Sequence, residues 1–271
     1  MSWGVALKIW YEVRWPTALF GAAMATILGV FAYVLPTLFT KYSQQFMQIE
    51  FVRSIVSALL GAQVGDTLNT TVMSSFPWVH PVVLTVLWAQ AISHCSRMPA
   101  GEVDRGTIDI ILALPVVRWR TYASECFALL CAGLFMVTMG WIGNRIGGWF
   151  VITEHRVPAS SLIKIAANMY VLYLAVGGLT LFVSACCDRR GRAVGIASGV
   201  VLASFFLSFL AQFWEPAKAV SFLSVMHYYK PLLIVRGAGW PVGDLLSLVA
   251  IGAMFSFAGS VIFSRRDFST G

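Results

Sequence analysis

Six long stretches of the chain carry no Lys, Arg, Asp or Glu, and they dominate the pattern of the sequence. Each is at least 19 residues long, whereas the next longest charge-free run, 54–65, has 12 residues. A helix needs about 20 apolar residues to cross a hydrocarbon core of roughly 30 Å, and a water-soluble domain has no reason to omit charge so regularly. The six stretches are 15–40, 67–96, 126–144, 165–187, 193–214 and 245–264.

This pattern predicts an all-α polytopic membrane protein with six transmembrane helices in a single domain, residues 1–271. The spans are expected at approximately 17–39, 77–96, 122–144, 165–187, 193–214 and 244–264.

Composition supports the same class of protein. With 58% hydrophobic residues, 11% charged residues and a mean hydropathy of +0.78, the spans and short connections use almost the whole chain. The net charge of +7 does not indicate a nucleic-acid partner. The cations stand at the ends of the spans, where anionic lipid headgroups and the positive-inside bias explain them.

The distribution of basic residues predicts the orientation. An even number of spans places both termini on one side, and basic residues cluster after the fourth and the sixth span, at 189–192 and 265–266. The inside then holds 11 Lys and Arg and the outside holds 8, so both termini are expected in the cytoplasm. All five cysteines lie at or near this face, where reduced thiols need no disulfide framework.

Three segments outside the spans have their own character. Residues 2–14 carry apolar side chains at helical spacing among charges and end at Trp15-Pro16, which predicts a short helix in the membrane interface; a mere basic flank of the first span is the alternative. Residues 41–66 predict an amphipathic helix on the outer surface. The outer segment 215–244 is too polar and broken to span, and its re-entry into the membrane stays open.

Small residues at four-residue spacing mark two spans. Span one carries Gly21, Ala25 and Gly29, and span five carries Gly195 and Gly199. Such faces allow helix backbones to approach closely. In a membrane this close contact drives association, because the hydrophobic effect does not favour helix–helix over helix–lipid contact. We expect these residues at a contact between two protomers. Packing within one subunit is the equal alternative.

The chemistry of transporters that use ion gradients is missing from the span interiors. No acidic or basic residue is expected there, and the two histidines of span two, His80 and His94, lie toward its opposite ends. The chain has no Walker A sequence and no metal-binding spacing such as CxxC or HxxxH. We therefore expect no catalytic site, no metal and no bound cofactor, and any energy source must be a separate subunit.

The connection between spans two and three is the most informative segment. Pro99 is suited to begin a short helix with Glu102 and Asp104 in its first turn. The Ile and Leu residues of 108–114 form an apolar surface too large to leave in water, and Pro115 ends it. An acidic turn on an apolar stem favours a cytoplasmic protein partner over the alternative, a helix on anionic lipid headgroups, which would repel the acids.

Several motifs carry a family resemblance from span two to the end of the chain. The main one runs from Glu102 to Arg118, with Gly106-Thr107 and Leu114-Pro115-Val116-x-Arg118. It is joined by Cys187-Asp-Arg-Arg-Gly-Arg192, by His227-Tyr228-Tyr229-x-Pro231 and by Phe263-x-Arg265-Arg266-Asp267. In order and spacing these motifs resemble the permease subunits of ABC-2 type ABC transporters.

The resemblance implies a function and a set of partners. Permeases of this family have six helices per protomer and form the translocation pathway as a dimer of identical or homologous protomers in the bacterial inner (plasma) membrane. Two ATP-binding cassette subunits dock below and bind ATP and Mg, so this chain would not itself be an enzyme. The resemblance also implies that the interfacial helix braces the docked ATPase and that spans one and five meet across the dimer.

The same resemblance assigns residues to the coupling between permease and ATPase. The segment from 97 to 121 would hold the main coupling helix, and the turn after span four would form a smaller second contact. The implied coupling residues are Glu102, Asp104, Arg105, Gly106, Thr107, Pro115, Arg118, Asp188, Arg189 and Arg190.

A passive membrane scaffold that anchors a larger complex is the alternative function. The sequence does not select residues that line a pathway. Polar residues within the spans, such as Gln90 and Asn168, are better explained by hydrogen bonds between helices.

Overall fold

The structure is a computed structural model that describes residues 3–47, 54–55, 76–151, 158–235 and 239–267. All regular structure in these residues is helical. The amphipathic helix expected at 41–66 lies largely outside the described residues, although α1 reaches Met47.

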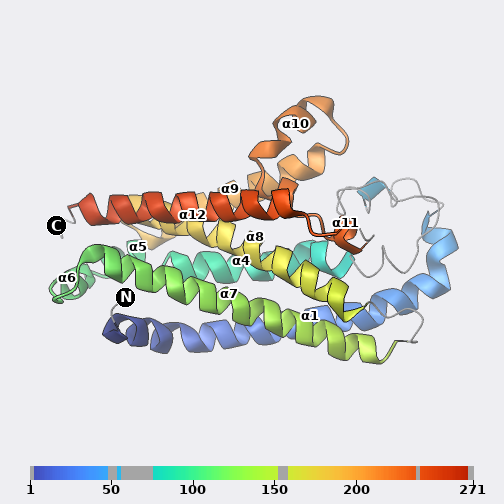
Figure 1. Cartoon of the computed structure of the whole chain (residues 1–271), viewed down its shortest axis with the longest axis horizontal. Coiled ribbons are helices and arrows are strands. Elements are labelled where there is room, and N and C mark those ends of the chain that lie inside the picture. Colours follow the sequence, from blue (N-terminus) through green and yellow to red (C-terminus); the bar gives the residue numbers. More distant parts are fainter. Residues whose placement is uncertain (1–2, 48–53, 56–75, 152–157, 236–238, 268–271) are drawn as a thin grey trace.

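Five helices are long and apolar enough to cross a membrane, and they lie side by side along the long axis of the molecule (Figure 1). They are α1 (Trp3–Met47), α7 (Arg118–Trp149), α8 (Ala159–Cys186), α9 (Arg190–Leu210) and α12 (Val242–Arg265). Each contains or overlaps one predicted span. The chain is therefore an all-α, multi-pass membrane protein.

The second predicted span, 77–96, corresponds to a shorter helix, α4 (Pro81–Cys95), which has 15 residues. A separate helical turn, Phe76–Val79, precedes it, and the break falls at His80-Pro81, where Pro81 begins α4 and lacks the amide hydrogen that would continue the ladder.

Helix α1 corrects the expected interfacial helix. Residues 3–14 and the first span form one continuous helix that passes through Pro16. The pattern Trp15-Pro16 predicted a boundary because proline disfavours helical backbone before it. In the structure α1 packs against α7 on both sides of this point, with Val13 near Ala128 and Gly21 against Phe135. Neighbouring helices make an internal proline tolerable in a membrane.

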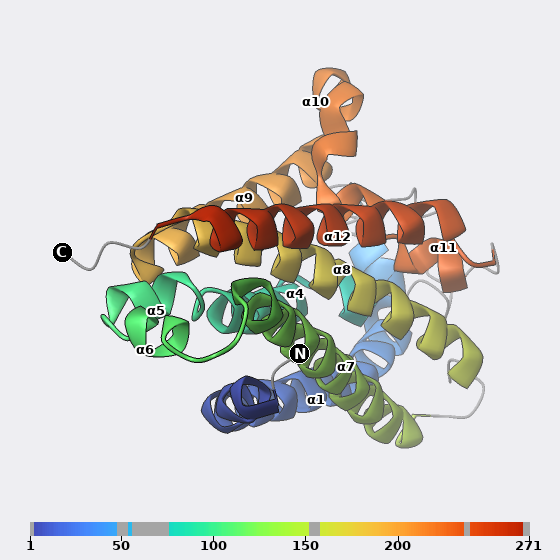
Figure 2. The same cartoon turned by 60° about the vertical axis from the view of Figure 1, so that its left-hand side comes forward.

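Helix α8 is the centre of the bundle. It packs against α4, α7, α9 and α12, and most of its side chains are buried. Figure 2 shows α8 between the layer of α9 and α12 and the layer of α4 and α7. The outer faces of the bundle instead carry large apolar side chains in the open, such as Leu134, Phe206 and Phe257. A helix bundle in lipid has apolar side chains both in its core and on its outer faces, as this chain does.

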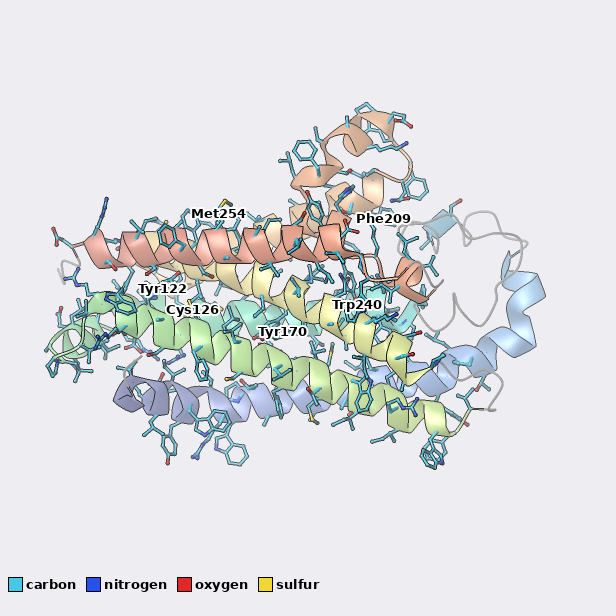
Figure 3. The ribbon with its side chains drawn as sticks, in the orientation of Figure 1. Tyr122, Cys126, Tyr170, Phe209, Trp240 and Met254 are labelled. Carbon is cyan, nitrogen blue, oxygen red and sulfur yellow. The ribbon has the colours of Figure 1, made fainter. Side chains whose placement is uncertain are left out.

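Tight packing joins α12 to α7 and α8. The rings of Tyr122 on α7 and Phe263 on α12 have their centroids 5.9 Å apart. A methyl group on Gly259 of α12 would lie 2.0 Å from the Tyr122 hydroxyl oxygen, so only glycine fits there. Figure 3 shows Tyr122 and Cys126 in the space between α7 and α12.

The segment between α9 and α12 is folded into short helices. These are α10 (Glu215–Val220), the 3-10 helices η2 (Ser221–Leu223) and η3 (Val225–Tyr228), and α11 (Pro231–Val235). In Figure 1, α10 projects from the bundle. Ser224 hydrogen-bonds Ser204 of α9, and the buried Tyr229 donates to the carbonyl of Trp78 at 3.0 Å. Ser224 therefore fixes this segment to α9, and Tyr229 of the motif 227–231 fixes it to the helical turn before α4.

Charged side chains lie near the two ends of the long helices. On α7, Glu125 and Arg145 are separated by about 30 Å at 1.5 Å per residue, which matches a hydrocarbon core. The N-terminus of α1 and the C-terminus of α12 lie at the same end (Figure 1). We call this the charged end; it comprises residues 3–12, 93–125, 184–192 and 265–267.

Candidate functional site

The connection between α4 and α7 contains two short helices, α5 (Ala100–Asp104) and α6 (Ile108–Leu112). Gly106 ends α5 with a φ of +68°, a conformation that glycine adopts without the steric cost of a Cβ. The amide of Gly106 donates to the carbonyl of Val103, and that of Thr107 donates to the carbonyl of Glu102. This pair of bonds is the Schellman motif, so Gly106-Thr107 fixes the turn between the two helices.

Glu102, which the resemblance assigns to the coupling, is buried against its neighbours. It is 1% exposed and accepts hydrogen bonds from Lys8 Nζ at 3.0 Å and Arg105 Nη2 at 2.7 Å, as well as from the Thr107 hydroxyl. Burial alone would raise the pKa of this carboxyl, but the hydrogen bonds from Thr107 and Lys8 and the two cations hold the pKa below its ordinary value. Glu102 therefore joins α5 to α1.

A second buried carboxylate, Glu125, was missed by the sequence argument. It lies within the expected span 122–144, two turns into α7, and is 1% exposed. Arg97 donates to Glu125 Oε1 at 2.7 Å and also bonds Glu12 of α1. The span that was expected to lack charge therefore holds an ion at its charged end.

His94 completes this group of side chains. Its Nε2 lies 3.9 Å from Glu125 Oε2, beyond hydrogen-bond distance, and neither atom has a hydrogen-bond partner in the described part of the chain. A cavity of about 340 Å³ opens beside the group and is lined in part by Lys8, Arg97, Glu125 and Pro115. The ion pairs thus form a buried network that links α1, the α4–α5 junction and α7.

The signal for this network is weak in the sequence. Glu125 immediately precedes a charge-free run, so the charge pattern alone assigns it to the connection, although the expected span 122–144 contains it. Arg97 and Glu125 are 28 residues apart, and Lys8 and Glu102 are 94 apart. Only a bundle that brings α1 beside α5 and α7 could reveal these pairs.

The turn after α8 lies directly against α5, and this brings together the two segments that the sequence assigns to coupling. The backbone amide of Arg190 donates to Asp104 Oδ2 at 3.4 Å, and the Arg190 side chain donates to the carbonyl of Ser93 at 3.0 Å. The amide of Ala100 donates to Ser184 Oγ of α8 at 3.1 Å. Residues about 85 positions apart in sequence therefore form one surface.

The C-terminal end of α12 closes the other side of this surface. Arg118 donates to the backbone carbonyl of Arg266 at 2.7 Å. Arg266 in turn donates to the carbonyl of Ala185 at 2.7 Å and pairs with Asp188. Arg118 and Arg266 thus hold α7, α8 and α12 together at the charged end.

The side chains that remain exposed at the charged end mix charge with apolar surface. Asp104, Arg105 and Asp109 are exposed, and Ile110 is 69% exposed. Pro115 is exposed in the loop before α7. The turn after α8 adds Asp188 and Arg189, which are exposed as well. This surface combines exposed charged side chains with an exposed isoleucine, a mixture that protein interfaces also contain.

The two sets of small residues have different environments. A methyl group on Gly21 would lie 2.5 Å from the Phe135 ring, and one on Gly143 of α7 would lie 2.0 Å from the carbonyl oxygen of Ala25. Gly29 approaches the same helix. Packing within the chain therefore accounts for the small face of α1, and a dimer contact there stays a prediction. Gly195 and Gly199 of α9 have open space around them.

Polar side chains within the bundle bond between helices. Gln90 of α4 donates to Thr17 of α1 at 3.2 Å and accepts from Tyr173 of α8 at 2.5 Å. Asn168 is fully buried without a hydrogen-bond partner among the described residues. In the same residues, no three His, Cys, Asp or Glu side chains are grouped to hold a metal ion.

Comparisons with protein-family models, with curated proteins and with solved structures find no match for this chain.

Proposed function

We propose that this chain is the permease subunit of an ATP-driven exporter that resembles the ABC-2 type, and that the charged end receives the ATP-binding subunits. The proposal rests on the motifs of the sequence together with one geometric observation. The two segments that the resemblance assigns to ATPase contact, 97–118 and 188–190, meet in a single surface through Asp104 and Arg190.

The buried ion pairs give this surface a physical route into the membrane. A partner that displaces α5 would act on α1 through Lys8 and Glu102, and on α7 through Arg97 and Glu125. The α4–α5 junction is held in turn by Arg190 of α9. Arg97 and Glu125 are buried at both partners and resist separation, because breaking the pair leaves an uncompensated charge. Lys8 is partly exposed, but it holds a carboxylate that is itself buried. Motion of the connection would therefore carry the helices with it.

In the proposed cycle, ATP binding closes two ATP-binding subunits on the cytoplasmic side. Their movement displaces the 97–121 connection, and spans one, two and five reorient to open a path outward. This chain supplies the pathway as a dimer, while ATP and Mg bind to the partner subunits. The proposal includes six spans, with α4 and the turn before it as the second, and both termini in the cytoplasm.

Because Glu102 is buried, docking is better tested by changing exposed residues near it. Asp109 and Ile110 are exposed, so Asp109→Lys with Ile110→Asp changes the surface without breaking a buried pair or the contact between Asp104 and Arg190. Tagged protein would be purified from its native membrane with its partner, and ATP hydrolysis in the purified complex would be measured. We expect hydrolysis to fall by roughly tenfold or more. A reversed charge opposes contact with the partner, and so does an aspartate in place of an exposed isoleucine.

The matched control is Glu215→Lys on α10, which is an exposed charge reversal at the opposite end of the bundle. It should leave the hydrolysis unchanged. Full coupled hydrolysis in the Asp109 and Ile110 double variant would remove the docking surface from the proposal. A passive scaffold would be indicated instead if hydrolysis co-purified but no substrate of the complex stimulated it in liposomes.

A further inference from the structure

A wide groove runs between the N-terminal part of α1 and the first half of α7. Its volume is about 740 Å³, and its lining is almost wholly apolar. Trp10 and Trp15 border it on α1, and Phe127 and Phe135 border it on α7. Nothing in the proposed export cycle uses this groove.

The groove follows from the packing of the two helices. Near Gly143 and Gly147 the backbone of α7 touches that of α1, because a methyl group on either glycine would lie 2.0 Å from a carbonyl oxygen of α1. Toward the charged end, large side chains hold the helices apart, and the ribbons of α1 and α7 diverge in both Figure 1 and Figure 2. The groove occupies the open part of this crossing.

Arg14 stands at the rim of the groove without an acidic partner. Its guanidinium lies over the ring of Tyr11 at 4.7 Å and over the ring of Trp15 at 5.8 Å. In the described residues no carboxylate pairs with it, whereas Lys8, Arg97 and Arg105 each pair with a glutamate. Cation–π contacts orient the guanidinium but leave its charge uncompensated.

The depth of Arg14 matches the boundary of the hydrocarbon core. Arg14 directly precedes the charge-free run 15–40, and on the facing helix Glu125 directly precedes the run 126–144. Trp10 is 60% exposed and Trp15 is 73% exposed, as aromatic side chains at a membrane interface are. The groove therefore has a cationic rim at headgroup level and an apolar floor at acyl-chain level.

We propose that this groove binds an acidic phospholipid of the surrounding leaflet. The lipid phosphate pairs with Arg14, and an acyl chain lies between α1 and α7. The uncompensated charge selects an anionic lipid over a zwitterionic one, because a zwitterionic headgroup already carries its own cation. This inference depends on the membrane-spanning helices and not on the export function.

The test uses the full-length protein in detergent with phosphatidylglycerol or phosphatidylcholine added. Native mass spectrometry would count retained lipids, and Arg14→Gln would be compared with wild type. We expect wild type to retain phosphatidylglycerol about fivefold better than phosphatidylcholine and the variant to lose this preference, since a basic side chain near anionic lipid gains about 1 kcal/mol. The matched control is Arg120→Gln, because Arg120 also stacks on a tryptophan, Trp119 at 5.5 Å, but lies outside the groove.

A second measurement uses two thiols that the chain already contains. Cys131 is an exposed free thiol in the groove, and Cys186 is an exposed free thiol on α8 outside it. Phosphatidylglycerol should slow maleimide modification of Cys131 relative to Cys186 by peptide mapping, and Arg14→Gln should remove the difference. Equal lipid preference in wild type and Arg14→Gln would overturn the proposal. So would protection of Cys131 that follows protein dimerisation rather than added lipid.

Discussion

At the residue scale, the charged end contains ions that a lipid-immersed bundle would be expected to exclude. Glu125 and Arg97 are both largely removed from solvent and bond each other at 2.7 Å. Transferring two charges from water costs several kcal/mol each, and their attraction repays this only when the geometry and the remaining hydrogen bonds are good. Here Glu12 supplies the second partner of Arg97. The pair therefore specifies how α1, α4 and α7 fit together more than it adds stability.

This view predicts strong coupling between Arg97 and Glu125. Arg97→Met should lower the free energy of unfolding by about 3 to 5 kcal/mol, because it leaves the buried Glu125 unpaired. Glu125→Leu should cost less, because Arg97 keeps its ion pair with Glu12. The double variant should cost clearly less than the sum, since both charges are gone and Glu12 keeps Lys8 at 3.4 Å. Denaturant unfolding in detergent would measure the cycle. Additive losses would show that the two residues do not act as a pair.

At the element scale, small residues decide how closely the helices approach. The four-residue spacing of Gly21, Ala25 and Gly29 was visible in the sequence, but the matching glycines of α7, Gly143 and Gly147, complete the contact. Close approach of this kind replaces the missing hydrophobic force between helices in lipid with van der Waals contact. The α1–α7 pair is consequently rigid at one end and open at the other, where the groove lies.

The glycines of α7 allow a matched test of this contact. Gly143→Ala should lower the free energy of unfolding by about 1 to 3 kcal/mol, because the methyl group would meet the Ala25 carbonyl and push α1 away. Gly148→Ala is the control on the same helix, since nothing lies within 4 Å of that position. The control should be neutral or slightly stabilising, because alanine favours helix over glycine. Equal behaviour of the two variants in thermal unfolding would contradict the packing argument.

At the scale of the whole molecule, the two ends have different constructions. The charged end is held by ion pairs and arginine-to-carbonyl bonds that join α1, α7, α8 and α12. The opposite end is held by serine and tyrosine hydrogen bonds to the short helices after α9. One face of α9 is left open between them, where Gly191, Gly195 and Gly199 have no neighbour within 4 Å.

The open face of α9 predicts where a second protomer binds. Gly195→Trp with Gly199→Trp should abolish most of the dimer, because two indoles would prevent close approach of the backbones. Light scattering of the purified protein would give the oligomeric state, and thermal unfolding would show that the protomer itself is intact. The control is Ala253→Trp, an equally bulky change at an exposed position of α12. If the dimer survives the two glycine changes but is lost in Ala253→Trp, the second protomer binds at α12 and not at the open face of α9.

The positions of five spans and of the turns at the charged end could be predicted from the sequence. Exclusion of charge from hydrocarbon acts on each segment separately, and therefore leaves a local pattern. Gly106-Thr107 and Pro99 are also local signals, and the structure places the end and the start of α5 there. The continuous α1 could not be predicted in this way, because contacts with α7 outweigh the boundary signal of Trp15-Pro16.

The sequence by itself thus determined that this is a helical membrane protein, and it determined where its apolar segments begin and end. Only the tertiary structure decided that Glu102 is buried against Lys8, that Glu125 pairs with Arg97, and that the small face of α1 is covered by α7. The two ion pairs join residues 94 and 28 positions apart, and the contact between Ala25 and Gly143 joins residues 118 positions apart. Periodicity reports the environment of a single helix, whereas pairing depends on which helices the bundle places side by side.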